Sequence, residues 1–502
     1  MPGRVQSRSF TTPSGGRAVD AASSGNGFGQ LAPLLSELDQ MAPSFDVRGD
    51  DIRIIQSPAE FYETLKDRIR NAKSRVFLST LYIGKSEREL IETLGEALRR
   101  NPELQLSILT DALRGTREAP NPSCASLLAP LISEFGAHRV EIRMYHTPNL
   151  TGMRKRYVPK RINEGWGLQH MKLYGVDDEI ILANLSADYF TNRQDRYHLF
   201  TSKQVTDYFW KIHSGVCSFS FLVEPAAGGA GFTLSWPEAN AAPSPLQKPK
   251  AFIRSTTSTL QSLIRPGAAQ PNSGLADTRV YMLSQMSQVL KPDCSTELPV
   301  ITRLLERLAS PRYEGSSWTF TAGYFNPAPS LVKLLLGTAS TANTVITAAP
   351  EANGFYKSRG VSGLLPDAYV LLARRFVHNV HRVGRDDEIS LKEWRHDTAC
   401  QPGGWTYHAK GLWVTMGGDV GPSMSIIGSS NYTERSYSLD LEAGALIVTR
   451  SEGLKARLAD EQRWLQTHAK TMTRDDFAKN ERRVGLKVRI AMWIVQLAGG
   501  AL

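Results

Sequence analysis

The chain has 502 residues, enough to bury two domain cores or one duplicated fold, and its 41% hydrophobic and 22% charged residues are ordinary for a globular protein. Its net charge of +10 favours a polyanionic partner, which leaves nucleic acid, an anionic lipid surface and phosphorylated substrates open. Four scattered cysteines without a CxxC pair argue against a disulfide framework or zinc cluster, and the lack of an apolar run of about 18 residues argues against a spanning helix.

The first residues resemble a targeting segment. The first acid of the chain is Asp20. The residues before it include Arg4, Arg8 and Arg17 and are rich in Ser and Thr. Arg- and Ser-rich, acid-poor starts are typical of mitochondrial transit peptides, with a disordered tail as the alternative. We therefore expect residues 1–27 to be a transit or disordered segment of a mitochondrial protein.

Short apolar segments recur in the same order at nearly constant separation. Residues 76–82 match 318–324, with Phe77 set against Phe320, and residues 106–110 match 344–347. Apolar, β-branched segments of this length bounded by turn residues predict buried strands. Order-preserving recurrence indicates that the chain is built twice.

Amphipathic helical patterns separate these strands, at residues 57–72, 87–99 and 297–308. Strands that alternate with helices predict an α/β sheet covered by helices. We expect one such unit over residues 28–223 and a second over residues 280–470.

Two further segments differ in composition from the halves. Residues 224–279 are rich in Pro, Gly and Ala and predict a low-complexity linker. Residues 471–502 form a basic, amphipathic C-terminal tail, in which the apolar stretch 490–497 follows several Arg and Lys residues. This tail either lies on an anionic membrane surface or docks as a helix on the core.

Two His-x-Lys pairs lie far apart in the chain, His170 with Lys172 and His408 with Lys410. A spacing of two puts both side chains on one face of a strand. Each pair is followed by an asparagine and, eleven residues after it, by an acid; these residues are Asn184 with Asp195 and Asn431 with Glu442. The matched spacing predicts one active site assembled from two halves.

Two imidazoles and two ammonium groups around one centre suit substitution at phosphorus. Histidine can attack phosphorus or carry a proton because its pKa lies near neutrality, and Lys and Asn donors can hold the developing charge. A buried carboxylate behind each imidazole would fix its tautomer, and Asp195 and Glu442 are the candidates.

The run His170-x-Lys172-x4-Asp177 and the turn 428–431, which contains Ser429 and Asn431, resemble the signature of the phospholipase D superfamily. Within it, the stretches 109–117, 168–174, 188–197, 324–327 and 407–413 are similar to the mitochondrial phosphatidylglycerophosphate synthases, a likeness that extends from about residue 42 to residue 449. The resemblance implies a duplicated α/β/α sandwich whose two pseudo-symmetric halves share one active site.

The resemblance also implies an activity. Members of that family convert CDP-diacylglycerol and glycerol 3-phosphate to phosphatidylglycerophosphate and CMP through a phosphohistidine, in phosphatidylglycerol and cardiolipin synthesis. They need no nucleotide cofactor; we expect no cofactor and no metal-ligating residues, and the mechanism does not demand a divalent ion. It further implies peripheral contact with anionic lipid on the matrix side of the mitochondrial inner membrane, and no nucleic acid. A phospholipase D-type phosphodiesterase and a catalytically impaired lipid-binding scaffold are the alternatives.

The motif match assigns expected roles to residues. His170 is the expected nucleophile and His408 the expected acid and base, with the reverse assignment left open. Lys172, Asp177 and Lys410 complete the catalytic set that the motif gives, and locking the fold is the alternative role of Asp177. The expected phosphate-binding residues, for which structural ion pairs are the alternative role of the arginines, are Asn184, Asn431, Ser429, Arg114, Arg117, Arg193 and Arg196.

The chain departs from the superfamily pattern at two places. Thr415 stands where the second motif carries Asp in the superfamily, and Ala183 runs straight to Asn184 without the small residue and Gly of that pattern. A shortened turn can misplace catalytic groups, and errors near 1 Å are costly in catalysis.

Overall fold

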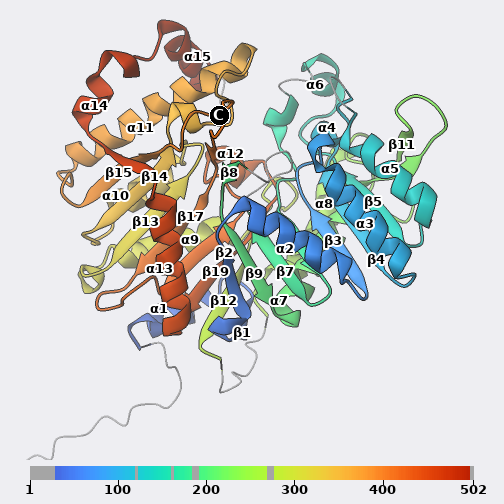
Figure 1. The fold of residues 1–502 in the computed structure, drawn as a ribbon, viewed down its shortest axis with the longest axis horizontal. Helices are drawn as coiled ribbons and strands as arrows, with labels where there is room; N and C mark the ends of the chain where they lie inside the picture. The colour runs from blue at the N-terminus through green and yellow to red at the C-terminus, as the bar shows by residue number, and fades with distance from the viewer. Residues whose placement is uncertain (1–28, 119–121, 160–162, 184–191, 268–275, 498–502) are drawn as a thin grey trace, which may run out of the picture.

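The structure is a computed structural model that describes residues 29–118, 122–159, 163–183, 192–267 and 276–497. Two large mixed sheets lie beside each other, the first in blue and green and the second in yellow and orange (Figure 1). Along the first sheet the strand order is β11-β10-β5-β4-β3-β6-β7-β9-β2. Its strands are β2 (Ile52–Ile55), β3 (Arg75–Ser79), β4 (Gln105–Asp111), β5 (Val140–Tyr145), β6 (Leu173–Val176), β7 (Glu179–Ala183), β9 (Tyr197–Thr201), β10 (Phe221–Pro225) and β11 (Phe232–Ser235).

The second sheet repeats this topology. Its order is β1-β12-β19-β18-β17-β13-β14-β15-β20, so that β12 to β20 correspond in sequence to β2-β9-β7-β6-β3-β4-β5-β10. Its strands are β1 (Ser44–Val47), β12 (Thr278–Gln285), β13 (Ser317–Ala322), β14 (Asn343–Ala348), β15 (Ile389–Trp394), β17 (Lys410–Thr415), β18 (Met424–Gly428), β19 (Glu442–Thr449) and β20 (Ala469–Met472). The predicted duplication is confirmed.

The strand pairing shifts one predicted match by a residue. Leu78 pairs with Tyr174 on β6, and Phe320 pairs with Leu412 on β17. Tyr174 and Leu412 each stand four residues after the histidine of their own half, so Leu78, not Phe77, is the counterpart of Phe320. A match between two apolar segments cannot fix which residues of the two strands are equivalent, because neighbouring positions of a buried strand are equally apolar.

Helices cover the outer faces of both sheets. The helix α2 shows why they form where they do: Ser57 caps it by accepting the Glu60 N–H at 3.1 Å, Pro58 occupies the first turn, and Phe61 and Leu65 bury one face. On the first sheet these helices are α2 (Pro58–Arg70), α3 (Arg88–Arg100) and α5 (Cys124–Phe135); on the second they are α1 (Ala32–Leu38), α9 (Glu297–Leu308), α10 (Pro329–Leu336) and α11 (Leu365–Arg382).

A central core lies between the two sheets and joins the halves. It draws side chains from both sheets, from α7 (Lys203–Cys217) of the first half and from α13 (Glu452–Gln466) of the second. Strands β7 and β18 approach each other across this core. The two halves therefore form one body with the helix–sheet layers on both sides, as the predicted α/β/α sandwich built twice requires.

Two expected segment boundaries differ from the structure. The strand β1, expected within the first half, pairs with β12 and extends the second sheet. The segment 224–279, expected to be a linker, carries β11 and the helix α8 (Pro249–Ile264), whose Phe252 and Leu260 are fully buried in the central core. Its apolar residues at helical spacing outweigh the Pro- and Gly-rich runs that flank them.

Short elements complete the described chain: α4 (Ala112–Gly115), α6 (Gly152–Tyr157), β8 (Arg193–Gln194), β16 (Thr406–Tyr407), α12 (Glu434–Ser438), α14 (Arg474–Ala478) and α15 (Leu486–Leu497). The C-terminal helix α15 docks on α11, where Val488 and Met492 pack against Ala368. Its Leu486 and Ile490 stay exposed, so the helix has one docked and one exposed apolar face. Within the described residues, no helix has the length and apolar character needed to cross a membrane.

Candidate active site

The two motif histidines are held by backbone contacts between the halves. The N–H of His408 donates to Gln194 O at 2.9 Å, where β8 pairs with β16. At the equivalent place, the N–H of His170 donates to Leu441 O at 2.9 Å, beside the bridge between Gln169 and Leu441. Each half therefore fixes the histidine backbone of the other.

The two predicted carboxylates are crossed in the same way. Nδ1 of His170 lies 2.9 Å from Oε1 of Glu442, and Nδ1 of His408 lies 2.9 Å from Oδ2 of Asp195. Both carboxylates are buried. An Nδ1–H that donates to a carboxylate leaves Nε2 as the nitrogen with a lone pair.

Burial controls the protonation of this site. Burial, aided by the nearby lysine charges, lowers the pKa of His170 and of His408 well below 6.5. Burial also raises the pKa of Asp195 and of Glu442 to about 7. The two imidazoles are consequently neutral near pH 7, the form that can attack phosphorus or accept a proton.

Both motif lysines stay next to their histidines. Nζ of Lys172 donates to His170 O at 2.6 Å, and Nζ of Lys410 lies 3.1 Å from each ring nitrogen of His408. Burial lowers the pKa of Lys410 to about 8 and that of Lys172 well below its usual range. The Lys410 ammonium in a desolvated site attracts an anionic substrate strongly, and the charge of a bound substrate favours the protonated form of both lysines.

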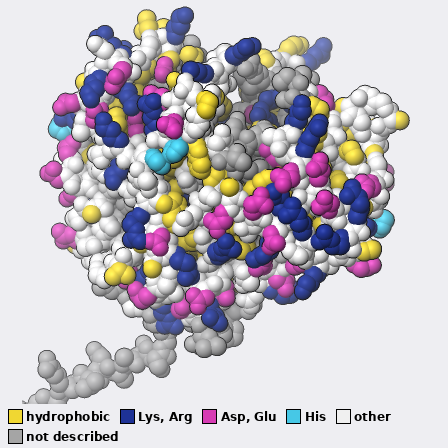
Figure 2. Space-filling model, viewed as in Figure 1, with side chains coloured by type: hydrophobic (Ala, Val, Ile, Leu, Met, Phe, Trp, Pro, Cys, Tyr) yellow, Lys and Arg dark blue, Asp and Glu magenta, His cyan; other side chains and the backbone are white. Residues whose placement is uncertain are grey.

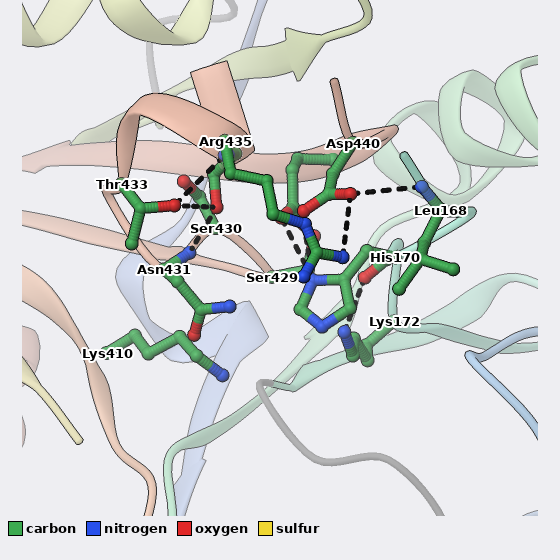
Figure 3. A network of polar contacts seen from close by, with 12 residues as sticks. Leu168, His170, Lys172, Lys410, Ser429, Ser430, Asn431, Thr433, Arg435 and Asp440 are labelled. Carbon is green, nitrogen blue, oxygen red and sulfur yellow. Dashed lines mark hydrogen bonds and ion pairs between the residues drawn. The ribbon is translucent and has the colours of Figure 1, made fainter. Parts of the chain in front are cut away.

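The side chain of Asn431 points into the same space as Lys410, Lys172 and the His170 ring (Figure 3). Its Oδ1 is buried and has no hydrogen-bond partner among the described residues. The backbone N–H of Asn431 donates to Ser436, so the turn is held while the amide is left to face the site. Asn184, the expected counterpart in the first half, lies outside the described residues, as does the turn that begins after Ala183.

Ser429 stands apart from the phosphate-binding role expected for it. Its hydroxyl donates to Glu442, and the same oxygen accepts the Ala443 N–H at 3.1 Å. The hydroxyl therefore orients the carboxylate behind His170. A Gly-Ser turn places its serine next to the following strand, and the motif alone does not show which residue of that strand the serine contacts.

Asp177 is not at the site, so its contacts fit the alternative, fold-locking role and not the catalytic role that the motif gives it. It occupies the turn between β6 and β7 with a φ of 50°, and its carboxylate accepts the N–H groups of Lys73, Ser74 and Arg75 at 2.8 to 3.1 Å. Aspartate tolerates this left-handed conformation better than most residues do. Its role is to lock the loop before β3 onto this turn.

Arg196 is also a structural residue rather than an acceptor-binding one. Its guanidinium is fully buried, pairs with Glu461 of α13 at 2.8 Å, and donates to the carbonyl groups of Lys410 and Ile426 at 3.1 and 2.6 Å. It also stacks 3.8 Å from the centre of the Trp413 ring. Burial alone raises the pKa of Glu461, but Arg196 and the adjacent His198 hold it at about 2.

Of the other three arginines, Arg193 is buried, and Arg114 and Arg117 are half-buried. Arg114 and Arg117 both contact Glu164, the former at 3.5 Å. Nε of Arg193 donates to Thr406 at 3.2 Å, and the Arg193 charge contributes to the low pKa of His408. These arginines keep the phosphate-binding role that the motif match gives them as a prediction.

The structure adds an ion pair that motif reasoning missed. Arg435 of α12 extends toward the His170 ring and contacts Asp440 at 3.2 Å (Figure 3). Asp440 also accepts the Leu168 N–H at 3.0 Å, two residues before the histidine. Asp440 stands nine residues after Asn431, the position that Arg193 holds after Asn184, so the matched spacing contained the signal.

Known proteins resemble the whole chain. It is 44% identical over 461 residues to the CDP-diacylglycerol–glycerol-3-phosphate 3-phosphatidyltransferase of Saccharomyces pastorianus, with 89% of this chain and 88% of that protein covered. It is 33% identical over 487 residues to the mitochondrial enzyme of that name from Homo sapiens, with 91% and 84% covered. The chain belongs to this family. The resemblance that the motifs carried is thereby confirmed, although no protein-family model matches the chain.

The fold has a solved counterpart as well. The crystal structure of the phosphatidylserine synthase from Haemophilus influenzae Rd KW20 superposes with a TM-score of 0.71 at 19% identity, covering 94% of this chain and 98% of that chain. At this identity the likeness concerns the fold alone. Among the described residues, no group of three or more His, Cys, Asp or Glu side chains is arranged to hold a metal ion.

Proposed function

We propose that this phosphatidyltransferase moves a phosphatidyl group from CDP-diacylglycerol to glycerol 3-phosphate through a phosphohistidine, releasing CMP. The observation that carries the proposal is the pair of imidazoles, His170 and His408, each backed at 2.9 Å by a buried carboxylate of the opposite half. A single histidine can act as a general acid or base, whereas a double displacement at phosphorus needs one group as the nucleophile and a second group as the acid and base.

In the first step, Nε2 of His170 attacks the phosphatidyl phosphorus. The P–N bond forms as the P–O bond to CMP breaks, and the electron pair departs on the CMP oxygen. That oxygen takes a proton from His408. When the substrate binds, its anionic diphosphate favours the protonated, charged form of His408. Little acid strength is needed, because a phosphate monoester takes its second proton with a pKa of about 6.

In the second step, glycerol 3-phosphate occupies the place that CMP has left. Neutral His408 takes the proton of its hydroxyl, the oxygen attacks phosphorus, and the P–N bond breaks with its electron pair returning to His170. The low pKa of His408 keeps it in the basic form at this stage. Lys172, Lys410 and Asn431 would hold the non-bridging oxygens throughout.

The acceptor has a phosphate of its own, and guanidinium groups suit it. Arg193 lies on the His408 side, while Arg114 and Arg117 lie around Glu164. Guanidinium groups bind phosphate in a bidentate manner that ammonium groups cannot match. We assign the acceptor phosphate to these arginines.

An assay with labelled glycerol 3-phosphate and CDP-diacylglycerol tests the activity. Acceptor-dependent CMP release with label in the lipid is expected; CMP release without acceptor would instead indicate a phosphodiesterase. Loss of all turnover with retained binding to lipid vesicles would indicate a scaffold. His170→Ala and His408→Ala are each expected to abolish transfer, and near-normal activity in either would refute the two-histidine mechanism.

A membrane-facing surface is part of the proposal, because the donor is a lipid. Six large hydrophobic side chains are exposed in the described part of the chain, and four of them lie on two short helices: Met153 and Tyr157 on α6, and Leu486 and Ile490 on α15. Both helices lie at the upper edge of the view, where Lys and Arg side chains gather (Figure 2).

The sequences around both helices are basic. Residues 152–161 and 482–502 contain no acid, and they include Arg154, Arg156, Lys487 and Arg489. Exposed apolar side chains among cations are typical of segments that lie on anionic bilayers. With mammalian relatives named mitochondrial, we assign this surface to the matrix side of the mitochondrial inner membrane.

Vesicle cosedimentation tests this surface, with phosphatidylcholine vesicles that contain or lack phosphatidylglycerol. The pairs Met153→Ser/Tyr157→Ser and Leu486→Ser/Ile490→Ser are each expected to weaken binding to the anionic vesicles about tenfold or more. Val420→Ser is the matched control, because Val420 is 79% exposed on a different loop. Equal losses in all three variants would refute a defined membrane surface.

A further inference from the structure

Each half has a tyrosine at the same position, but the neighbours of this tyrosine differ between the halves. Tyr82 follows β3 and Tyr324 follows β13 at the position that the strand registers make equivalent. The guanidinium of Arg114 lies over Tyr82, 4.6 Å from its ring centre. Tyr324 instead belongs to an aromatic cluster, in which Tyr369 of α11 stacks on it at 5.7 Å and Phe355 lies 5.3 Å away.

This aromatic cluster adjoins the second histidine. The Tyr324 ring meets His408 edge to face, with ring centres 5.1 Å apart. Gly323 makes the approach possible, because a Cβ at this position would come within 2.6 Å of the His408 Cα. Tyr324 and Phe355 are partly exposed and Tyr369 is buried, so the aromatic cluster reaches the surface through the first two rings, next to His408.

A cation borders the same face. A Cβ at Gly354 would lie 2.6 Å from Oη of Tyr324 and 3.0 Å from Nη2 of Arg193, so the phenol and the guanidinium meet at this glycine. At the equivalent position beside His170 stands Asp440, paired with Arg435. A guanidinium therefore borders the aromatic face on the His408 side, whereas the equivalent position on the His170 side holds an ion pair.

We infer that Tyr324, Phe355 and Tyr369 form the nucleotide subsite of the proposed reaction, with the cytosine on the aromatic face and the CMP phosphate beside Arg193. This inference rests on the proposed function. Aromatic faces bind bases by stacking, and a guanidinium binds phosphate. An acyl chain of the donor is a poorer occupant, because a cation and phenol hydroxyls border the face.

The position of the nucleotide sets the direction of the reaction. In a double displacement, the leaving group departs opposite the attacking nitrogen, and the acceptor enters from the side that the leaving group has vacated. CMP on the His408 side therefore leaves attack to His170 and proton transfer to His408. Arg193 then serves the CMP phosphate first and the acceptor phosphate afterwards.

Competition binding tests the subsite in the full-length protein. Wild type is expected to bind CMP more tightly than ribose 5-phosphate, which lacks the base. Tyr324→Ala is expected to weaken CMP binding about 5- to 100-fold, the range of base stacking, while ribose 5-phosphate binding stays within about twofold. Tyr324→Phe keeps the ring and retains the preference. Tyr356→Ala, in the same loop but outside the cluster, is the matched control.

Two results would overturn the inference while wild-type transfer remains intact, which separates it from the proposed function. One is a Tyr324→Ala protein with an unchanged preference for CMP. The other comes from donor labelled in the phosphatidyl phosphate, added without acceptor and quenched rapidly. Label on His170 in a His408→Ala protein supports the assignment, and label on His408 in a His170→Ala protein overturns it.

Discussion

Replacing Glu442 with glutamine tests whether a carboxylate of one half activates the histidine of the other. Glu442 is fully buried, and its Oε1 lies 2.9 Å from Nδ1 of His170 while Ser429 donates to its Oε2. The carboxylate keeps the proton on Nδ1 and stabilises the positive charge that grows on the ring as the P–N bond forms. A glutamine of the same shape can donate to Nδ1 and reverse the tautomer.

The expected loss follows from the buried geometry. Removing one partner of a buried, charge-assisted pair costs about 3–5 kcal/mol, and 1.36 kcal/mol is tenfold in rate, so kcat should fall about 10²- to 10⁴-fold. KM for the lipid donor should stay within about threefold, because Glu442 acts on the transition state through His170. The fold should survive, since the substitution removes a buried carboxyl without changing its shape.

Rapid-quench measurement of labelled phosphohistidine resolves the step that fails. Glu442→Gln should slow formation of the intermediate, whereas Asp195→Asn, the equivalent change behind His408, should slow its transfer to glycerol 3-phosphate. A Glu442→Gln enzyme within about threefold of wild-type kcat, or one slowed only in the transfer step, would refute the crossed assignment.

Thermal melting supplies a second readout for the same variant. The folded pKa of Glu442 is raised to about 7 from 4.5, so its contribution to stability is present below pH 4.5 and is lost as the pH rises through 7. Glutamine does not titrate. The melting temperature of Glu442→Gln relative to wild type should therefore rise between pH 5 and pH 8, and a constant or falling difference would contradict the burial argument.

Three further predictions concern pH and stability. Since burial raises the pKa of Asp195 and of Glu442 to about 7 and lowers that of Lys410 to about 8, kcat/KM should fall below pH 7, where the carboxylates behind the histidines are protonated, and fall again above pH 8, and Lys410→Arg should move the alkaline limit upward in the transfer assay. Arg196→Ala leaves Glu461 charged and buried, so urea unfolding should show a loss of about 3–5 kcal/mol that adding Glu461→Gln partly restores; a loss below about 1 kcal/mol would contradict the buried pair. Asp177→Ala should cost about 1–3 kcal/mol in the same titration and leave kcat within about twofold, and a large fall in kcat would return Asp177 to the catalytic set.

The sequence predicted the site because the spacing of the site residues can be read within each half and because the same spacing occurs twice along the chain. Asp195 and Glu442 were found by their equal distance from an asparagine, and the structure brings both to histidine nitrogens. Spacing within one half could not tell which histidine each acid serves. The answer depends on β8 pairing with β16 across the halves, a contact between residues more than 200 positions apart.

Residue type alone gave a wrong role where two arginines lie close together in the sequence. Arg193 and Arg196 are three positions apart, yet Arg193 borders the site and Arg196 is buried against Glu461. Arg193 lies on β8, whereas Arg196 lies between β8 and β9 on neither strand, so the alternation of side chains along a strand could not separate the two roles. Glu461 itself lies on α13, and no pattern near the motifs could have paired it with Arg196.

A duplicated site must become asymmetric before it can run a directional reaction. Two equivalent histidines with equivalent carboxylates would bind a diphosphate in either orientation and expose either phosphorus to attack. One pair of positions at which the structure breaks the equivalence is Arg193 beside His408 and Asp440 beside His170. Asp440 in turn carries Arg435 as its partner, so the two sides place different charged groups beside their histidines. Each of these residues comes from the half opposite the histidine that it adjoins, so the asymmetry exists only in the joined halves and neither half could orient the substrate alone.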